Sequence, residues 1–166
     1  MHDARVLPGP SDPPPRHAPE LSECGFYLVI RPDGFVLHMS ASAVHLREMR
    51  AQVFKEVCGA GAGEGVADAA RLVASELVGN AVRLCGPWAP VVVQVAISPD
   101  QVLVQVHDPE PAAVPKRRPR PPGNDKSESG RGLWILDLLA PGWTVRPTPV
   151  GKQIRCHLPY EGRNCA

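Results

Sequence analysis

The stretch from Ala70 to Leu84 constrains the fold of this chain more than any other, because it combines a strong helical pattern with two polar residues at a fixed spacing. Apolar residues recur every three or four positions and predict a helix from about Gly65 to Leu84 with one buried stripe. Glu76 and Asn80 are four residues apart, so both side chains leave the helix on one face, beside that stripe. A carboxylate and an amide oxygen placed this way can act on one metal-bound ligand, but the same spacing is also typical of a solvated helix flank. The expected stripe consists of Val66, Ala69, Ala70, Val73, Leu77, Ala81 and Leu84.

Strand and helix patterns are segregated along the rest of the chain. Two β-prone runs flank the turn Arg-Pro-Asp-Gly at 31–34, and a helix with apolar positions at Leu46, Met49, Val53 and Val57 follows, capped by Ser40 or Ser42. This segregation favours an α+β fold, a two-layer sandwich with helices packed on one face of a mixed β-sheet. The expected strands are Phe26–Ile30, Phe35–Met39, Val91–Ile97, Val102–His107, Trp143–Arg146 and Gln153–Leu158, and a third helix is expected at Gly130–Leu139.

Three motifs that agree in order and spacing, followed by a segment similar to a final strand, resemble a known superfamily over about residues 36 to 159. They are E-L-V-G-N-A-V-R, D-P-E-P, S-G-R-G-L-W-I-L and G-K-Q-I-R-C-H-L. The order is similar to that of the Bergerat-type ATP-binding fold of gyrase, Hsp90, histidine kinases and MutL. Within that superfamily the chain is most similar to the small anti-sigma-factor serine kinases.

The resemblance implies a site for ATP and Mg²⁺. Asn80 would supply an amide oxygen to Mg²⁺, whose other ligands are phosphate oxygens and water, and Glu76 would hold the attacking hydroxyl or water in line as the catalytic residue. Asp108, at a strand end, would accept from the adenine amino group, although an aspartate there can also cap a turn. The implied nucleotide-binding residues are Asn80, Asp108, Gly130, Arg131, Gly132 and Gln153.

The glycine pair at 130–132 opens a helix, where backbone N–H groups and the helix dipole favour phosphate, but a plain helix-entry turn gives the same pattern. Three positions depart from the family, and the first is Gly79, which replaces a more typical hydroxyl or small residue inside the helix that carries Glu76 and Asn80. Glu110 stands where relatives often have glycine, and Gln153 stands where they commonly have a hydroxyl residue, usually threonine, near the adenine.

A proline-rich stretch at 109–129 is expected to be an ATP lid within a domain at 23–160, between a disordered tail at 1–22 and a short tail at 161–166. A solvated linker explains the same composition. The basic residues of this stretch are Lys116, Arg117, Arg118, Arg120 and Lys126.

Composition narrows the function classes. A net charge of +1 gives no general attraction to nucleic acid or to a membrane surface, and neither a membrane-spanning run nor a signal core is expected. Five cysteines without metal-ligand spacing suggest reduced thiols in a cytoplasmic protein and argue against zinc.

The expected function is an ATP- and Mg²⁺-binding regulator, a serine/threonine protein kinase of the anti-sigma type. The alternative is a non-catalytic, nucleotide-dependent protein-binding module. Because the start is proline-rich, we do not expect the phosphoacceptor hairpin of a histidine kinase, and because about eight residues follow the last expected strand, we do not expect a gyrase-like transducer domain. The resemblance implies a sigma factor or an anti-sigma antagonist as partner, and a homodimer, since relatives commonly dimerise.

Overall fold

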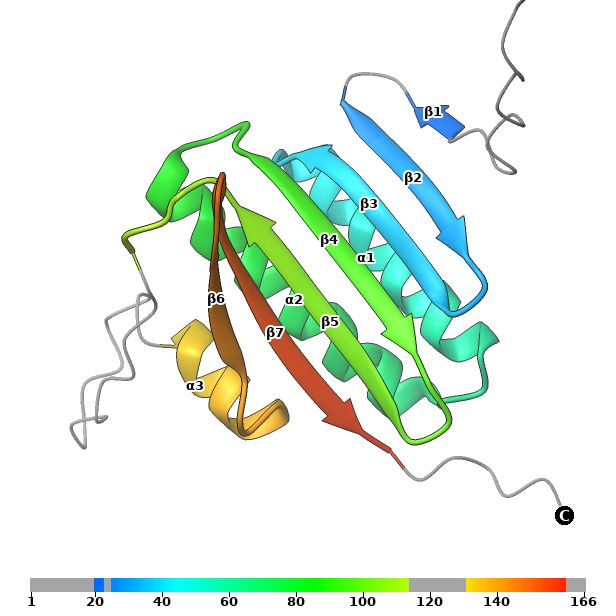
Figure 1. Cartoon of the computed structure of the whole chain (residues 1–166). Helices are drawn as coiled ribbons and strands as arrows, with labels where there is room; N and C mark the ends of the chain where they lie inside the picture. Colours follow the sequence, from blue (N-terminus) through cyan, green and yellow to red (C-terminus); the bar gives the residue numbers. More distant parts are fainter. Residues whose placement is uncertain (1–19, 23–24, 114–130, 161–166) are drawn as a thin grey trace, which may run out of the picture.

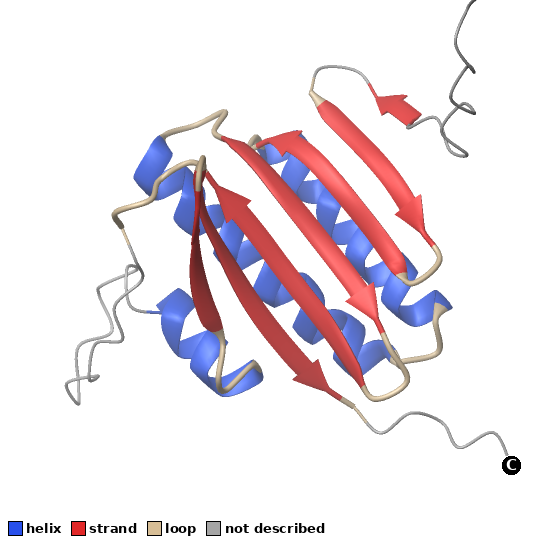
Figure 2. Cartoon of the chain, in the orientation of Figure 1, coloured by secondary structure: helices blue, strands red, loops and turns tan. Residues whose placement is uncertain are grey.

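The apolar, β-branched runs form one antiparallel sheet, and the helices form a layer on one of its faces (Figures 1 and 2). The computed structural model of the chain describes residues 20–22, 25–113 and 131–160. In these residues the sheet has seven strands in the order β1-β2-β3-β4-β5-β7-β6. The strands are β1 (Glu20–Ser22), β2 (Phe26–Arg31), β3 (Gly34–Ser40), β4 (Pro90–Ile97), β5 (Gln101–Asp108), β6 (Thr144–Thr148) and β7 (Gly151–Pro159). The helices are α1 (Ala43–Gly59), α2 (Glu64–Cys85) and α3 (Arg131–Leu139).

The α+β sandwich predicted from the sequence is confirmed, but the expectation of a mixed sheet is wrong. Every pair of neighbouring strands is antiparallel. The connection from β3 to β4 explains part of this result, because it contains two helices joined by the short loop at 60–63. One helix would carry the chain back to the start of a parallel strand, whereas two antiparallel helices return it to the end of the sheet at which β3 finished.

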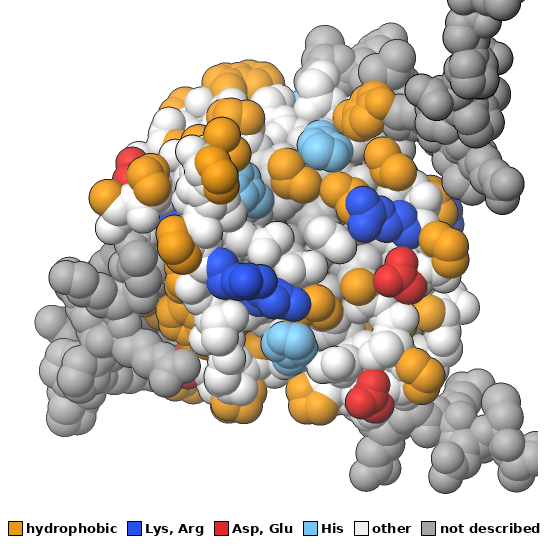
Figure 3. Space-filling model, in the orientation of Figure 1, with side chains coloured by type: hydrophobic (Ala, Val, Ile, Leu, Met, Phe, Trp, Pro, Cys, Tyr) orange, Lys and Arg blue, Asp and Glu red, His pale blue; other side chains and the backbone are white. Residues whose placement is uncertain are grey.

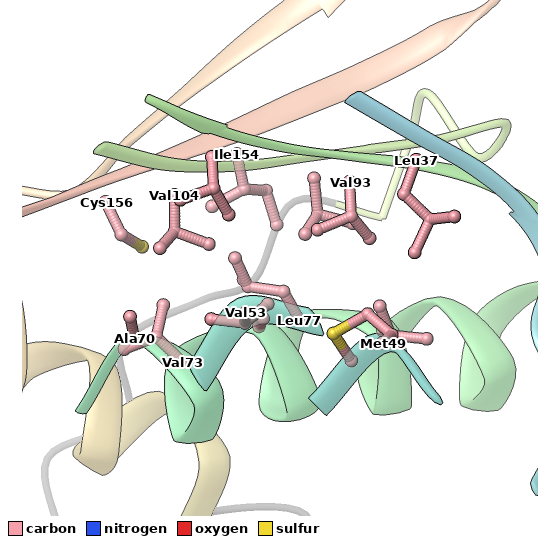
Figure 4. Close-up of a cluster of buried hydrophobic side chains, with 14 of the residues drawn as sticks. Leu37, Met49, Val53, Ala70, Val73, Leu77, Val93, Val104, Ile154 and Cys156 are labelled. Carbon is pink, nitrogen blue, oxygen red and sulfur yellow. The ribbon is translucent and has the colours of Figure 1, made fainter. Parts of the chain in front are cut away.

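The core lies between the sheet and the helix layer, as Figure 4 shows. Val93, Val104 and Ile154 extend from the sheet toward Met49 of α1 and Leu77 of α2 (Figure 4). The buried stripe of α2 is rotated slightly from the expected one, because Leu84 is exposed and Asn80 is buried. The buried residues of α2 are Ala67, Ala70, Val73, Ala74, Leu77, Val78, Asn80 and Ala81.

The N-terminal strand and the cap of α1 add detail to the sequence expectations. Residues 20–22, which were expected in the disordered tail, form a short strand paired with β2. Of the two candidate caps of α1, the structure uses Ser42, whose hydroxyl accepts from the backbone N–H of His45. The remaining residues of both tails lie outside the described part of the chain. No helix of the described residues is long and apolar enough to cross a membrane.

Candidate functional site

The site begins with the two polar residues of α2. Glu76 is half-buried, and Asn80, one turn later, is only 7% exposed. The Asn80 Oδ1 accepts a hydrogen bond from Nη2 of Arg83, and the Asn80 Nδ2 has no hydrogen-bond partner among the described residues. A buried amide with an unsatisfied group costs free energy, so this side chain is suited to a ligand that completes its hydrogen bonds.

Arg83 is a residue of this site that sequence reasoning missed. It lies three positions after Asn80 on the exposed side of α2, at a spacing that brings helical side chains together. The Arg83 guanidinium donates to the Asn80 Oδ1, which is the atom that a metal ion would coordinate. Because Arg83 is exposed, its side chain can leave that oxygen without disturbing the core.

Magnesium fits the donor set of this face. Mg²⁺ prefers hard oxygen ligands and commonly takes only one or two from the protein. The Asn80 amide oxygen and the Glu76 carboxylate are of this kind. The described residues contain no group of three or more His, Cys, Asp or Glu side chains arranged to hold a metal ion, so a metal at this site would depend on ligand oxygens as well.

Asp108 continues the inward-facing row of β5, since side chains alternate between the two faces of a strand. It is 2% exposed and forms an ion pair with Lys152 of β7, with a distance of 2.8 Å between Nζ and Oδ1. The same Oδ1 accepts from the backbone N–H of Glu110 at 3.0 Å, and the Lys152 Nζ also donates to the Glu110 carbonyl oxygen at 2.6 Å. The carboxylate is therefore held in place by two donors.

The register of β5 with β7 corrects one expected site residue. Asp108 lies opposite Lys152, and Gln153 lies opposite His107. Because Lys152 shares the inward row with Ile154, Gln153 points to the open face of the sheet and not toward Asp108. The residue beside Asp108 is thus Lys152, which the sequence did not indicate, because lysine is rarely buried without a partner.

The last turn of α2 reaches the same cluster. Burial raises the pKa of the Cys85 thiol, and the Asp108 and Glu110 carboxylates raise it further, while Lys152 and a hydrogen bond with the Glu110 backbone act in the opposite direction. These influences place Cys85 close to the ion pair. The end of α2, the end of β5 and the start of β7 therefore meet at one point of the fold.

Gly151 permits this meeting. Its φ is +141°, and a Cβ at this position would overlap the Asp108 carbonyl oxygen and crowd the Pro109 Cα. Only glycine allows the backbone of β7 to approach the end of β5 so closely. This close approach determines where Lys152 lies relative to Asp108.

The phosphate-binding residues expected after the lid are placed only in part. Arg131 and Gly132 form the start of α3, as the helix-opening pattern predicted, and α3 packs against α2. Gly130 and the basic residues of the expected lid, 116–126, lie outside the described residues.

The open face of the sheet is separate from this cluster. Figure 3 shows basic and histidine side chains among apolar ones on that face. His107 belongs to it, with its Nε2 2.7 Å from the Thr148 hydroxyl, and the half-buried Arg155 has an Nε without a hydrogen-bond partner in the described part of the chain.

Comparison with known proteins identifies the family of this domain. The sequence model of the histidine kinase-like ATPase domain matches residues 39–157, which is well over half of the chain. An uncharacterized protein of Streptomyces coelicolor is 39% identical over 72 residues, covering 43% of this chain and 67% of that protein. Residues 39–157, which the family model matches, include α2, Asp108 and the part of β7 that carries Lys152.

Proposed function

The chain belongs to the histidine kinase-like ATPase domain family, and from this membership we propose that it is a Mg²⁺-dependent ATP-binding regulator that phosphorylates a serine or threonine of a protein partner. The observation that carries the proposal is the pair on α2. Half-buried Glu76 lies one turn before Asn80, whose buried amide nitrogen has no hydrogen-bond partner among the residues that the structure describes. This is the arrangement that a nucleotide and its metal ion would complete.

Each residue has a definite task in the proposed reaction. Asn80 would hold Mg²⁺ by its amide oxygen once Arg83 withdraws, and the bound ion would neutralise charge on the phosphate oxygens. Asp108 would accept from the adenine amino group. Glu76 would accept the proton of the attacking serine or threonine hydroxyl, whose oxygen forms a bond to the γ-phosphorus as the bond between the γ-phosphorus and the bridging oxygen of ADP breaks.

The proposed partners are a sigma factor or its anti-sigma antagonist, together with a second copy of the chain in a homodimer. A cytoplasmic location is supported by the free thiols of Cys58, Cys85 and Cys156, since oxidising compartments favour disulfides.

A non-catalytic binding module is the second candidate, and two contacts favour it. Arg83 holds the oxygen of Asn80, and Lys152 is bonded to Asp108. A domain with these contacts could bind nucleotide and change its affinity for a protein without transferring phosphate.

Phosphoryl transfer from [γ-³²P]ATP to an array of serine- and threonine-containing peptides separates the two candidates. The wild-type protein should label peptides in the presence of Mg²⁺, and Glu76→Gln should reduce labelling by about 100-fold or more while nucleotide binding persists. Glu48→Gln makes the same chemical change on the exposed side of α1 and should label as the wild type does. ATP binding without any labelling would favour the binding module, and equal labelling by Glu76→Gln would remove Glu76 from the reaction.

A further inference from the structure

The buried ion pair at the ends of β5 and β7 has unused hydrogen-bonding capacity. Lys152 has three N–H donors and uses two of them, on the Asp108 Oδ1 and on the Glu110 carbonyl oxygen. Asp108 uses Oδ1 for both of its bonds, and its Oδ2 receives no hydrogen bond from the described residues. Within the part of the chain that the structure describes, one acceptor and one donor on these two contacting side chains are therefore still available.

Structural stability alone does not account for this pair. The two side chains extend the inward rows of β5 and β7, where the neighbouring positions are Val106 and Ile154. An ion pair at such a position is often no more stabilising than apolar residues of similar volume, because both charges must lose their hydration. A ligand that uses the remaining donor and acceptor would explain why charges occupy these positions.

We propose that Lys152 is a specificity-determining residue that reads the purine base together with Asp108, an inference that rests on the proposed function. The 6-amino group of adenine donates to the Asp108 Oδ2, and the third N–H of Lys152 donates to adenine N1. Adenine presents this donor and this acceptor side by side on its pyrimidine edge, so one base satisfies both free groups of the ion pair.

The same arrangement disfavours guanine. Guanine has an acceptor, O6, where adenine has its amino group, and an N1–H donor where adenine has an acceptor. Guanine bound in the same position would place its O6 against the carboxylate of Asp108 and its N1–H against the ammonium of Lys152. A site whose buried polar groups are left unpaired by an analogue rejects that analogue strongly.

Titration calorimetry with ATP and with 1-deaza-ATP, in which N1 is replaced by C–H, tests this assignment. The wild-type protein should bind 1-deaza-ATP about tenfold more weakly than ATP and GTP at least about tenfold more weakly, in line with the usual value of a good base contact. Lys152→Met should bind ATP and 1-deaza-ATP equally, because the donor to N1 is gone. Lys55→Met, which removes an exposed lysine of α1, should keep the wild-type ratio.

If Lys152→Met does not fold with Asp108 left unpaired, the double variant Asp108→Asn/Lys152→Met carries the test, since it contains neither charge and should also bind the two nucleotides equally. A wild-type ratio near one, or a wild-type ratio retained in the variant that lacks Lys152, would overturn the inference while leaving the proposed function intact. Tighter ATP binding by Lys152→Met would also overturn it, since Lys152 would then obstruct the base. Absence of any ATP binding by the wild-type protein would instead contradict the proposed function.

Discussion

Replacing Lys152 by methionine should destabilise the fold strongly, because it breaks a buried ion pair from one side only. Both side chains of the pair are almost completely buried, at 1% and 3% exposure for Lys152 and Asp108. Without the ammonium, the backbone N–H of Glu110 is the one donor that the described residues still give the Asp108 carboxylate, and the Glu110 carbonyl oxygen loses the donor at 2.6 Å. Removing one partner of a buried pair typically costs about 3–5 kcal/mol. The remaining hydrogen bond of Asp108 places the expected loss at the lower end, about 3 kcal/mol.

Urea unfolding followed by tryptophan fluorescence, to which buried Trp143 contributes, measures this loss as a change in the free energy of unfolding at unchanged m-value. The matched variant is Asp108→Asn/Lys152→Met, in which neither of these two positions carries a charge. It should recover most of the loss and lie within about 1–2 kcal/mol of the wild type, because apolar or neutral replacements of a whole buried pair are commonly near neutral. A single variant within about 1 kcal/mol of the wild type, or a double variant less stable than the single, would refute the buried pair as described.

Three further perturbations follow from the same structure. Burial raises the pKa of the Cys156 thiol from 9.0 to about 12. The stability that the protonated thiol contributes is therefore complete below pH 9 and is lost as the pH rises toward 12. The urea midpoint of the wild type should fall more between about pH 8 and pH 10.5 than that of Cys156→Ala, and equal falls would contradict the raised pKa. Gly151→Ala should lower the melting temperature markedly, because the new Cβ overlaps the Asp108 carbonyl oxygen, and a melting temperature equal to that of the wild type would show that β7 does not approach β5 so closely. Arg83→Ala should increase the effect of Mg²⁺ on nucleotide affinity in calorimetry, because it frees the Asn80 oxygen, and a smaller effect would show that Arg83 assists the metal-bound state.

The sequence predicted the layers of this fold better than it predicted the contacts between them. Periodicity places α2 within one residue at each end, because a single buried stripe of a long helix is unambiguous. The short turns at 31–34 and 98–100 favour antiparallel neighbours, but the longer connections give no signal of strand direction, so the antiparallel character of the whole sheet was not predicted. The short β1 strand was missed because its three residues carry no pattern of their own and depend on pairing with β2.

The candidate site shows the same limit at the level of single residues. Glu76 and Asn80 were found because their geometry depends on one helix alone. The partner of Asp108 depends on the register between two strands whose paired residues, Asp108 and Lys152, are 44 positions apart in sequence. Ile154 and Cys156 are apolar and lie on the same face of β7 as Lys152, so their spacing could have indicated an inward lysine. Buried lysine is rare, however, and the family resemblance pointed to Gln153 instead.

Asn80 is proposed to bind the Mg²⁺ ion that accompanies the nucleotide, and ATP titration with and without Mg²⁺ measures this dependence of nucleotide affinity on the metal directly. The wild-type protein should bind ATP with micromolar to millimolar affinity and more tightly with Mg²⁺, whereas Asn80→Ala should bind with the same affinity whether or not Mg²⁺ is present, because the amide oxygen is lost. A wild-type protein that does not bind ATP at millimolar concentration, or an Asn80→Ala variant that keeps the full response to Mg²⁺, would contradict the claim.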